Sequence, residues 1–404
     1  MQNLIFRKQY LDKITPFMGK KLIKVITGQR RVGKSYLLFQ LIEKIKQSDS
    51  TTHIIYINKE DLQFSHIKTA QDLADFILAN KKTGVKNHIF IDEIQEINDF
   101  EQALRSLLLD DDLDLYCTGS NAKLLSTDIA GTLSGRAIEI QVYALSYFEF
   151  LEFMQLDNHS KSLNLYFKYG GLPFLKELPL QDDVIFEYLK NIYSTIVVRD
   201  IVNRYNIRNG LFLEQLTQFL ADNIGNLFSA KKISDFLKSQ KINISNIQVQ
   251  NYAEYLNNAF LIHKVNRYDI ERKRIFEIGE KYYFEDLGIR NALIGYRISD
   301  RAKILENMVF HHLKIAGFDI KIGGLNSQEI DFVADKNGER IYVQVALMID
   351  SDKTAEREFG NLLKIADNYP KYVVTLDEFD GNSINGIKCL NFIEFITEIL
   401  GENP

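Results

Sequence analysis

The amino-acid sequence predicts an α/β protein whose first part is a doubly wound, parallel β-sheet. Two observations support this fold class. Five short runs rich in β-branched residues lie between residues 21 and 158, each about as long as a buried parallel strand. Consecutive runs are separated by enough chain for a crossover helix, an alternation typical of a sheet covered by helices on both faces. The five runs are KLIKVITG, HIIYINKE, HIFIDEI, LDLYCTG and AIEIQVY.

The pattern changes after residue 158. Residues 159–207 are mostly helical in pattern, and residues 208–285 contain two or three helical stretches followed by a β-ribbon, the order of elements in a winged helix-turn-helix. From residue 286 a helix precedes mixed strands and helices. We therefore expect four parts: a sheet domain (1–158), a helical lid (159–207), a winged helix (208–285) and a C-terminal α/β domain (286–404).

Composition narrows the class of protein. The 404 residues are 46% hydrophobic and 25% charged, as in ordinary globular proteins, and the net charge of −5 argues against a general coat of positive charge. The two cysteines, Cys117 and Cys389, are far apart, so no disulfide framework is expected, and Cys117 is predicted to fill the core. No signal peptide or spanning apolar run is found, which favours a cytoplasmic protein.

A phosphate-binding loop follows the first strand. GQRRVGKS matches G-x-x-x-x-G-K-[ST] at Gly28, Gly33, Lys34 and Ser35, and a helical stretch follows it. Such glycines let backbone N–H groups face an anion at a helix N-terminus, while the lysine reaches the β- and γ-phosphates and the serine hydroxyl reaches Mg²⁺. We expect nucleotide contacts along the loop, whose remaining residues are Gln29, Arg30, Arg31, Val32 and Tyr36. The two arginines are expected to face solvent or a partner.

A pair of acids ends the third predicted strand. In HIFIDEI, Asp92 and Glu93 follow an apolar run, about sixty residues after the phosphate loop. An acid at the tip of a buried strand can hold Mg²⁺ through water, and its neighbour can polarise an attacking water. We therefore predict Asp92 on the metal and Glu93 as the catalytic base.

Several stretches resemble one family. ITGQRRVGKSYLL, IFIDEIQEI and CTGSNAKLLSTDIAGTLSGRAIEIQVYALSYFEFLEF are similar to the bacterial and archaeal AAA-type ATP-binding proteins whose C-terminal half is an uncharacterised nuclease-like domain. VVRDIVNRYNIRN, YYFEDLGIRNAL, LENMVF and EIDFVA resemble the same family, so the resemblance covers nearly the whole chain. It implies an ATPase core in which the catalytic acid adjoins the Mg²⁺ acid.

The resemblance also implies roles for residues outside the loop. Ser120 and Asn121 match a sensor of the γ-phosphate or the water, although this stretch could simply cap a helix. Arg136 matches an arginine finger that acts on a neighbouring copy, or it is a surface arginine. Pro173, after Gly170 and Gly171, matches a lid motif near the adenine, or a plain turn between helices. Arg199 is either a lid sensor that reaches back to phosphate or the partner of an acid on a helix.

The C-terminal domain contains the elements of a nuclease-like site. QEIDFVADKNGERIYVQVA predicts two strands joined by a tight turn at Asn337–Gly338. In the PD-(D/E)xK nuclease fold, a helix Glu, a strand Asp and E/Q-x-K on the next strand bind a divalent metal. This sequence offers Glu306, Asp331 and Gln344, but Ala346 replaces the lysine, and Lys336 or Lys353 could substitute. We expect a nuclease-like fold that has lost cleavage.

The middle segment has a feature that suits nucleic acid. Residues 229–274 contain nine Lys and Arg against four Asp and Glu, and the wing would turn at Arg272-Lys273-Arg274. Its second helix would expose Asn246, Gln248, Gln250 and Asn251, which suit base edges. The alternative is a winged helix used only for packing.

The sequence thus predicts an AAA-type ATPase that hydrolyses Mg-ATP to rearrange its winged-helix and nuclease-like domains and that forms a homo-oligomer through Arg136. Duplex or branched DNA is the candidate partner of the winged helix. The alternatives are an ATP-dependent switch without hydrolysis, which binds DNA or protein, and an ATP-gated nuclease.

Overall fold

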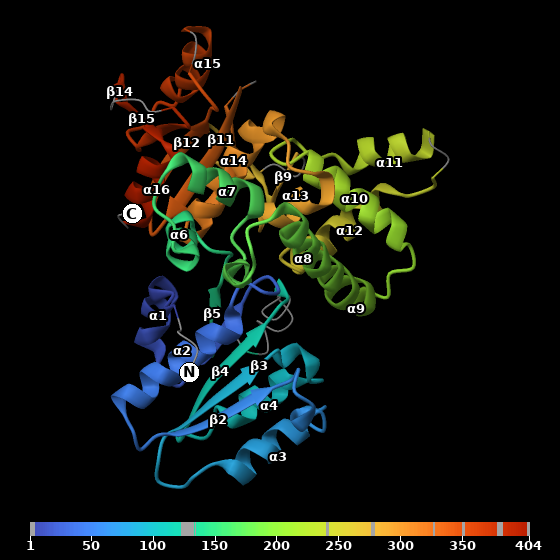
Figure 1. Ribbon diagram of the computed structural model, residues 1–404, viewed down its shortest axis with the longest axis vertical. Helices are drawn as coiled ribbons and strands as arrows, with labels where there is room; N and C mark the ends of the chain where they lie inside the picture. Colours follow the sequence, from blue (N-terminus) through green and yellow to red (C-terminus); the bar gives the residue numbers. More distant parts are fainter. Residues whose placement is uncertain are drawn as a thin grey trace. The chain divides into compact units, whose positions relative to one another are not determined.

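The computed structural model describes residues 5–122, 133, 135–239, 242–275, 279–325, 328–349, 352–377 and 383–401, with only the backbone of 352–356. The chain divides into two compact units. The first comprises Met1–Ala144, Ile196–Asp200 and Asn258–Phe260, and the second comprises Leu145–Thr195, Ile201–Asn257 and Leu261–Pro404. Figure 1 shows the chain coloured along its sequence. No helix within the described ranges is long and apolar enough to cross a membrane.

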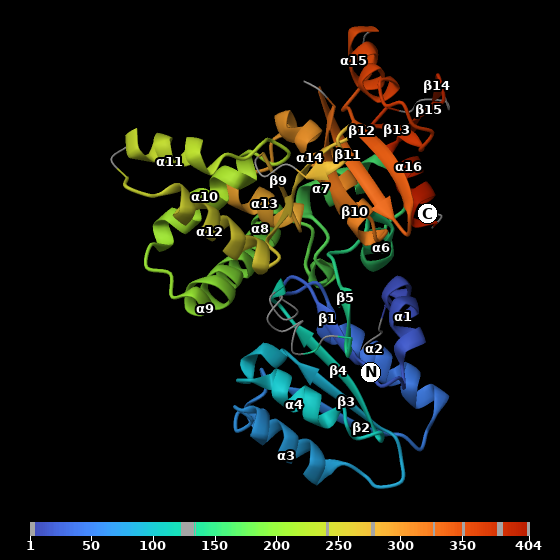
Figure 2. The same ribbon diagram turned by 180° about the vertical axis from the view of Figure 1, so that it is seen from behind.

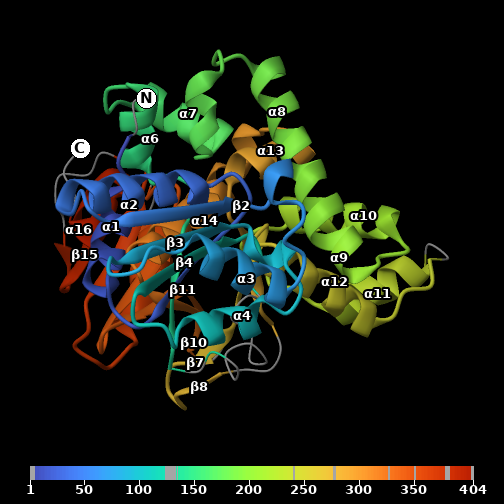
Figure 3. The same ribbon diagram turned by 90° about the horizontal axis from the view of Figure 1, so that it is seen from below.

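The first unit contains the parallel sheet that the sequence predicts. All five predicted strands form, in the order β2-β3-β4-β1-β5, and every neighbouring pair is parallel. Helices α1 and α2 cover one face and α3 and α4 cover the other (Figure 3). The elements are α1 (Lys8–Ile14), β1 (Ile23–Thr27), α2 (Lys34–Ser48), β2 (His53–Asn58), α3 (Ala70–Asn80), β3 (Asn87–Asp92), α4 (Phe100–Leu107), β4 (Leu113–Gly119) and β5 (Ala137–Gln141).

The core of this sheet explains why the short runs become strands. Every residue of β1, β3 and β4 is buried, as expected for parallel strands covered on both faces. Cys117 is 1% exposed within the apolar cluster of β3, β4 and the covering helices, so its predicted place in the core is confirmed. Since parallel strands end at one edge of a sheet, the residues after β1, β3 and β4 lie near one another.

The second unit begins with helices. They are α6 (Tyr147–Met154), α7 (Ser160–Tyr169), the 3₁₀ turn η5 (Pro173–Glu177), α8 (Asp182–Thr195), α9 (Asn203–Tyr205), α10 (Gly210–Asp222), α11 (Ala230–Ser239) and α12 (Asn246–Asn258). Strands β6 (Ile262–Val265), β7 (Arg267–Asp269), β8 (Arg274–Ile275) and β9 (Lys281–Phe284) follow. The predicted sequence of helices and a β-ribbon is therefore present, and its use as a winged helix stays a prediction.

A mixed sheet organises the C-terminal part, with the order β14-β15-β13-β12-β11-β10-β7-β8 (Figure 2). Asn337 and Gly338 both have positive φ, 52° and 86°, as the predicted tight turn between β11 and β12 requires. The elements are α13 (Leu287–Ile294), α14 (Arg301–Ile315), β10 (Asp319–Leu325), β11 (Gln328–Lys336), β12 (Glu339–Val345), α15 (Asp352–Leu363), β13 (Lys371–Thr375), β14 (Ser383–Ile384), β15 (Ile387–Asn391) and α16 (Phe392–Leu400).

The division into two units does not coincide with the predicted boundaries at residues 158, 207 and 285. Helix α6 belongs to the second unit, and within that unit the imidazole of His312 accepts a hydrogen bond from the first backbone N–H of α6, at Tyr147, over 3.0 Å. The expected wing also crosses its boundary. Strand β7 pairs in parallel with β10, so the ribbon is the edge of the C-terminal sheet.

Candidate functional site

The phosphate loop joins β1 to α2, and its glycines are where the backbone needs them. Gly28 has φ +145°, and a Cβ there would lie 2.2 Å from the carbonyl oxygen of Val142. Gly33 has φ +98° and directly precedes the first helical residue, Lys34. A side chain would be strained at Gly33 and excluded at Gly28. The loop therefore wraps tightly onto the N-terminus of a 15-residue helix, the arrangement that binds anions.

Buried polar groups hold this loop. The ammonium of Lys34 donates to the carbonyl oxygens of Gly28 and Gln29, each over 2.9 Å. Burial lowers the pKa of Lys34, while Glu93 and Asp92 oppose that shift. From the start of α1, the guanidinium of Arg7 donates to the carbonyl oxygen of Val32 over 3.0 Å. Arg7, the residue before α1, thus holds the loop by a hydrogen bond to its backbone.

The acids of the third strand lie at the same edge of the sheet. Asp92 is the last residue of β3 and Glu93 follows with φ 57°, a left-handed conformation that turns the chain sharply. Both are buried. Asp92 accepts hydrogen bonds from Thr118 and, over 3.1 Å, from the hydroxyl of Tyr56. The backbone N–H of Glu93 donates to the Thr118 hydroxyl over 2.9 Å. The fourth strand therefore fixes the position of both acids.

Glu93 is held in a form suited to accepting a proton. Its carboxylate accepts hydrogen bonds from Gln95 and, over 3.2 Å, from the hydroxyl of Ser120. Burial alone would raise the pKa of Glu93, but Lys34 and Arg30 outweigh it and lower the pKa overall. Glu93 is therefore ionised at neutral pH and oriented by Ser120, a residue predicted as a sensor.

One expectation about the loop is wrong. Arg30 was expected to face solvent or a partner, yet it is 6% exposed. Its guanidinium makes two hydrogen bonds with the carboxylate of Asp200, 2.9 and 3.0 Å long, and a third of 3.1 Å with Glu60. Burial opposes the charge, but Asp200 outweighs it and raises the pKa of Arg30. Arg31 is exposed, as expected, with φ 73°.

The residues present fit a magnesium nucleotide. Gln29 is fully buried, and among the described residues neither polar atom of its amide has a hydrogen-bond partner. Such an amide beside a helix N-terminus suits a polar ligand. Ser35, half-buried at the start of α2, and Asp92 supply the oxygen donors that Mg²⁺ prefers. Val32 is buried within the loop and Tyr36 is half exposed beyond it.

The other predicted residues lie in several places. Asn121 is buried directly after Ser120. Arg136 is exposed, and its carbonyl oxygen accepts from the N–H of Ile23 at the start of β1, over 2.8 Å. The phosphate loop follows the other end of that strand. Five strand residues span roughly 16 Å, so Arg136 lies across the sheet from the loop of its own chain.

Two further predictions concern the lid. The guanidinium of Arg199 donates over 3.0 Å to Glu60, an acid in the turn after β2 and not on a helix. Pro173 lies in the second unit, at the start of η5. There the N–H of Gly171 donates to the carboxylate of Asp286 over 2.7 Å, so this stretch makes the turn between α7 and η5. A place for Pro173 near the adenine stays a prediction.

A second polar cluster lies in the C-terminal part. Glu306 of α14, Asp331 of β11 and Gln344 of β12 come together, as predicted, but around Lys281 of β9. The Lys281 ammonium lies 3.2 Å from Glu306, 3.9 Å from Asp331 and 2.7 Å from Glu329. Gln344 accepts from the N–H of Asp331 over 3.4 Å. Lys336 is half-buried and stands over Phe318, and Lys353 is outside the described side chains.

The charges of this cluster are balanced within it, by a lysine that lies among the acidic side chains. Burial lowers the pKa of Lys281, but Glu306 and Asp331 outweigh it and raise the pKa overall. Burial, aided by Glu306, raises the pKa of Asp331 well above its usual range. Within the described part of the chain no three His, Cys, Asp or Glu side chains are arranged to hold a metal ion. The ammonium of Lys281 thus stands among the carboxylates as their counter-ion.

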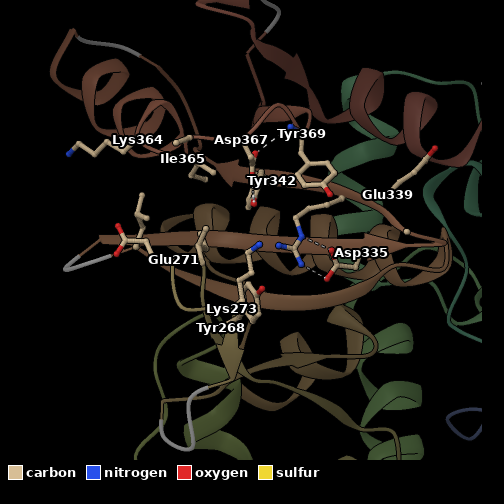
Figure 4. A pocket seen from close by; sticks show the side chains of 15 residues that line it. Tyr268, Glu271, Lys273, Asp335, Glu339, Tyr342, Lys364, Ile365, Asp367 and Tyr369 are labelled. Atoms are coloured by element: carbon tan, nitrogen blue, oxygen red, sulfur yellow. Dashed lines mark hydrogen bonds and ion pairs between the residues drawn. The ribbon is translucent and has the colours of Figure 1, made fainter.

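A cavity of about 670 Å³ lies elsewhere in the second unit, between the β7–β8 hairpin and the β11–β12 hairpin (Figure 4). Two pairs of its charged and polar side chains are bound to each other. The guanidinium of Arg340 binds Asp335 at 2.6 and 3.0 Å, and the hydroxyl of Tyr342 donates to Asp367 over 2.6 Å. Lys273 of the basic turn reaches its edge. The sequence gives no pattern for this cavity, since its walls come from four separate segments.

Three site residues escaped the sequence analysis. Asp200 is 170 residues from Arg30, so no local spacing connects them. Thr118 was visible only as part of the fourth strand. Lys281 lies in the segment expected to form the wing, 25 residues from Glu306. The sequence analysis did single out Arg199, the neighbour of Asp200. Of these two residues, however, Arg199 is the exposed one and Asp200 is the buried one.

Comparisons with known proteins agree with the first unit. The family described as AAA domain matches residues 20–151, and a domain of unknown function (DUF8612) matches residues 160–300. The nuclease-like identity of the C-terminal part is not supported by these matches. Among solved structures, the Aeropyrum pernix ORC1 protein in complex with DNA is similar with 12% identity and a TM-score of 0.33, over 72% of this chain and 93% of that chain. A likeness this weak carries no inference about ligands.

Relatives span almost the full length. An uncharacterized protein of Haemophilus influenzae is 36% identical over 403 residues, which are 98% of this chain and 99% of the relative. An uncharacterized protein of Methanocaldococcus jannaschii is 34% identical over 332 residues, 78% of this chain and 70% of the relative. This chain therefore belongs to the same family as these bacterial and archaeal proteins, and its residues 20–151 are an AAA domain.

Proposed function

We propose that this chain is an AAA-type ATPase that binds Mg-ATP at the phosphate loop and hydrolyses it. One observation carries the proposal: Lys34, Asp92 and Glu93 meet at one edge of the sheet, with Glu93 buried, ionised and oriented by Ser120. An isolated phosphate loop supports binding alone. A positioned, ionised carboxylate beside it adds the group that hydrolysis needs.

Each residue then has a role. Lys34 neutralises charge on the phosphates, and Ser35 and Asp92 hold Mg²⁺, which offsets charge in phosphoryl transfer. Glu93 accepts a proton from water, while Ser120, with Asn121, keeps the carboxylate directed to that task. Arg136 acts on the site of a neighbouring copy, because it lies across the sheet from its own loop. The free energy released drives rearrangement of the parts that follow the AAA domain.

Phosphate release from Mg-ATP tests this function. Glu93→Gln keeps the size and hydrogen bonding of the side chain but cannot accept the proton, so we expect turnover to fall about 10²- to 10⁴-fold with nucleotide affinity preserved. Glu96→Gln, at an exposed acid three residues on, is the matched control and should leave turnover unchanged. Equal release by wild type and Glu93→Gln, with both binding ATP, would instead make the chain a nucleotide-dependent switch.

A contact with nucleic acid is the second candidate. Helix α12 exposes the uncharged polar side chains that suit base edges, and the β7–β8 hairpin, later in the sequence, exposes three cations. We propose that this surface binds duplex or branched DNA. The exposed residues are Asn246, Gln248, Gln250, Asn251, Arg272, Lys273 and Arg274.

For the C-terminal cluster we propose that no cleavage occurs. Ala346 cannot orient a water, and the Lys281 ammonium already stands beside the acidic side chains that a metal would need. Metal-dependent DNA cutting that Asp331→Ala abolishes would show the opposite, an ATP-gated nuclease.

A further inference from the structure

Asp200 connects the two halves of the candidate nucleotide site. Its carboxylate is 2% exposed and binds both arms of the guanidinium of Arg30, which belongs to the phosphate loop. The same carboxylate accepts a hydrogen bond of 3.4 Å from the hydroxyl of Ser120. The single proton of that hydroxyl is shared with the carboxylate of Glu93, 3.2 Å away. The side chain of Asp200 thus contacts both Arg30, which belongs to the phosphate loop, and Ser120, which orients Glu93.

A second connection reinforces the first. Glu60, in the loop after β2, accepts hydrogen bonds from Arg30 over 3.1 Å and from Arg199 over 3.0 Å. Arg199 and Asp200 are neighbours in sequence, so two consecutive side chains tie one short segment to the phosphate loop. The pair with Asp200 is buried and bidentate, the strong form of such an interaction, whereas the pair with Glu60 is half exposed and weak.

The segment that carries these side chains has unusual geometry. Ile196–Val202 forms a π-helical turn between α8 and α9. Such turns are rare and occur often at functional sites. Residues Ile196–Asp200 belong to the first unit, while the chain before and after them belongs to the second. Asp200 therefore lies in a short stretch of the first unit that continues along the chain into α8 on one side and α9 on the other.

We propose that Asp200 is a positioning residue through which the nucleotide site controls the segment Ile196–Val202. The proposal rests on the function proposed above. A bound triphosphate adds negative charge beside Arg30, where it competes with Asp200 for the guanidinium. The ion pair between Arg30 and Asp200 then weakens, and the hydrogen bonds of the π-helical turn open more often. After loss of the terminal phosphate, Asp200 pairs with Arg30 again and, through Ser120, returns Glu93 to its original position.

Hydrogen–deuterium exchange of the full chain, with and without Mg²⁺ and the non-hydrolysable analogue AMPPNP, tests this control. In the wild type we expect nucleotide to speed exchange within residues 196–202. In Asp200→Asn the same amides should exchange about ten- to a hundredfold faster without nucleotide, and AMPPNP should change them little. Asp183→Asn, at an exposed acid of α8, is the control and should behave as wild type.

Steady-state kinetics distinguish a positioning role of Asp200 from a merely structural one, because only the positioning role changes kcat without changing KM. Asp200→Asn should lower kcat about 10- to 100-fold through misplacement of Glu93 while KM for ATP changes little, and Asp200→Glu should restore part of kcat. If the wild type binds no AMPPNP by calorimetry, the proposed function itself fails. If it binds, but residues 196–202 exchange equally with and without nucleotide or Asp200→Asn matches wild type, the role of Asp200 is refuted and the ATPase proposal stands.

Discussion

The ammonium of Lys281 lies 3.2 Å from the carboxylate of Glu306, at the centre of the residues that the sequence predicts as a nuclease-like site. Strand β9 supplies this lysine, and the hydroxyl of Tyr283, two residues on, also donates to Glu306 over 2.7 Å. Lys281 is 3% exposed. Buried carboxylates without a counter-ion are costly, so the cluster depends on this one cation.

Replacement of Lys281 should therefore destabilise the protein. Lys281→Met leaves Glu306, Glu329 and Asp331 without their cation, and we expect a loss of about 3–5 kcal/mol in the free energy of urea unfolding. Lys336→Met is the control. A wild-type-like urea midpoint for Lys281→Met would contradict the account of this cluster.

Arg136 should act only between copies of the chain. Because it lies across the sheet from its own phosphate loop, Arg136→Ala should lower turnover by about 10³-fold or more without loss of ATP binding. Arg136→Ala and Glu93→Gln should each be inactive, yet a mixture should regain activity wherever an intact base meets an intact arginine. An inactive mixture, or full turnover by Arg136→Ala alone, would show that this arginine has no such role.

His312 should make stability fall in mild acid. Burial, with His311 beside it, lowers the pKa of His312 from 6.5 to about 3. The unfolded chain therefore takes up a proton before the folded one does. The stabilisation is complete above pH 6.5 and is lost as the pH falls toward 3, by about 3 kcal/mol near pH ~4.5.

The variant His312→Gln isolates this effect. An amide can still accept from Tyr147 and donate to the carbonyl oxygen of Met308, the two contacts of the imidazole, but it does not titrate in this range. The difference between wild-type and variant urea stability should shrink as the pH falls. His66→Gln, at an exposed histidine, should give a constant difference. A constant difference for His312→Gln too would refute the prediction.

The basic hairpin should contribute salt-dependent affinity for DNA. Replacement of Arg272, Lys273 and Arg274 by Gln should weaken binding to duplex DNA and reduce the slope of log affinity against log salt by up to about 3, near 0.9 per phosphate contact. The control carries Gln at three exposed lysines of other elements, Lys46, Lys68 and Lys161. Equal slopes for both variants would leave the hairpin with its packing role, as the edge of the C-terminal sheet.

Local pattern was enough to predict the elements. Apolar runs of strand length gave β1 to β5, and Asn337–Gly338 gave the hairpin of β11 and β12, because both signals arise from neighbouring residues. Lys34, Asp92 and Glu93 were found for the same reason. Each lies at the end of a recognisable strand or the start of a recognisable helix.

Pairings distant in sequence could not be predicted this way. Asp200 meets Arg30 only after the chain has returned to the first unit, and Lys281 meets Glu306 because β9 runs beside α14. The parallel pairing of β7 with β10 likewise depends on the folded sheet, so the ribbon looked like an independent wing. The sequence around a charged residue does not identify its ion-pair partner. Only the folded structure shows which charged side chains are buried and therefore need a partner of opposite charge.

Calorimetric titration of the full chain with ATP and Mg²⁺ tests the central claim most directly. The account predicts saturable binding at one site per chain, with Lys34→Ala weakening it at least about tenfold, as expected for the loss of a charge-assisted contact to phosphate. Half-buried Lys44→Ala, on the same helix, should bind as wild type. Folded protein that takes up no ATP, or that binds equally well without the Lys34 ammonium, would contradict it.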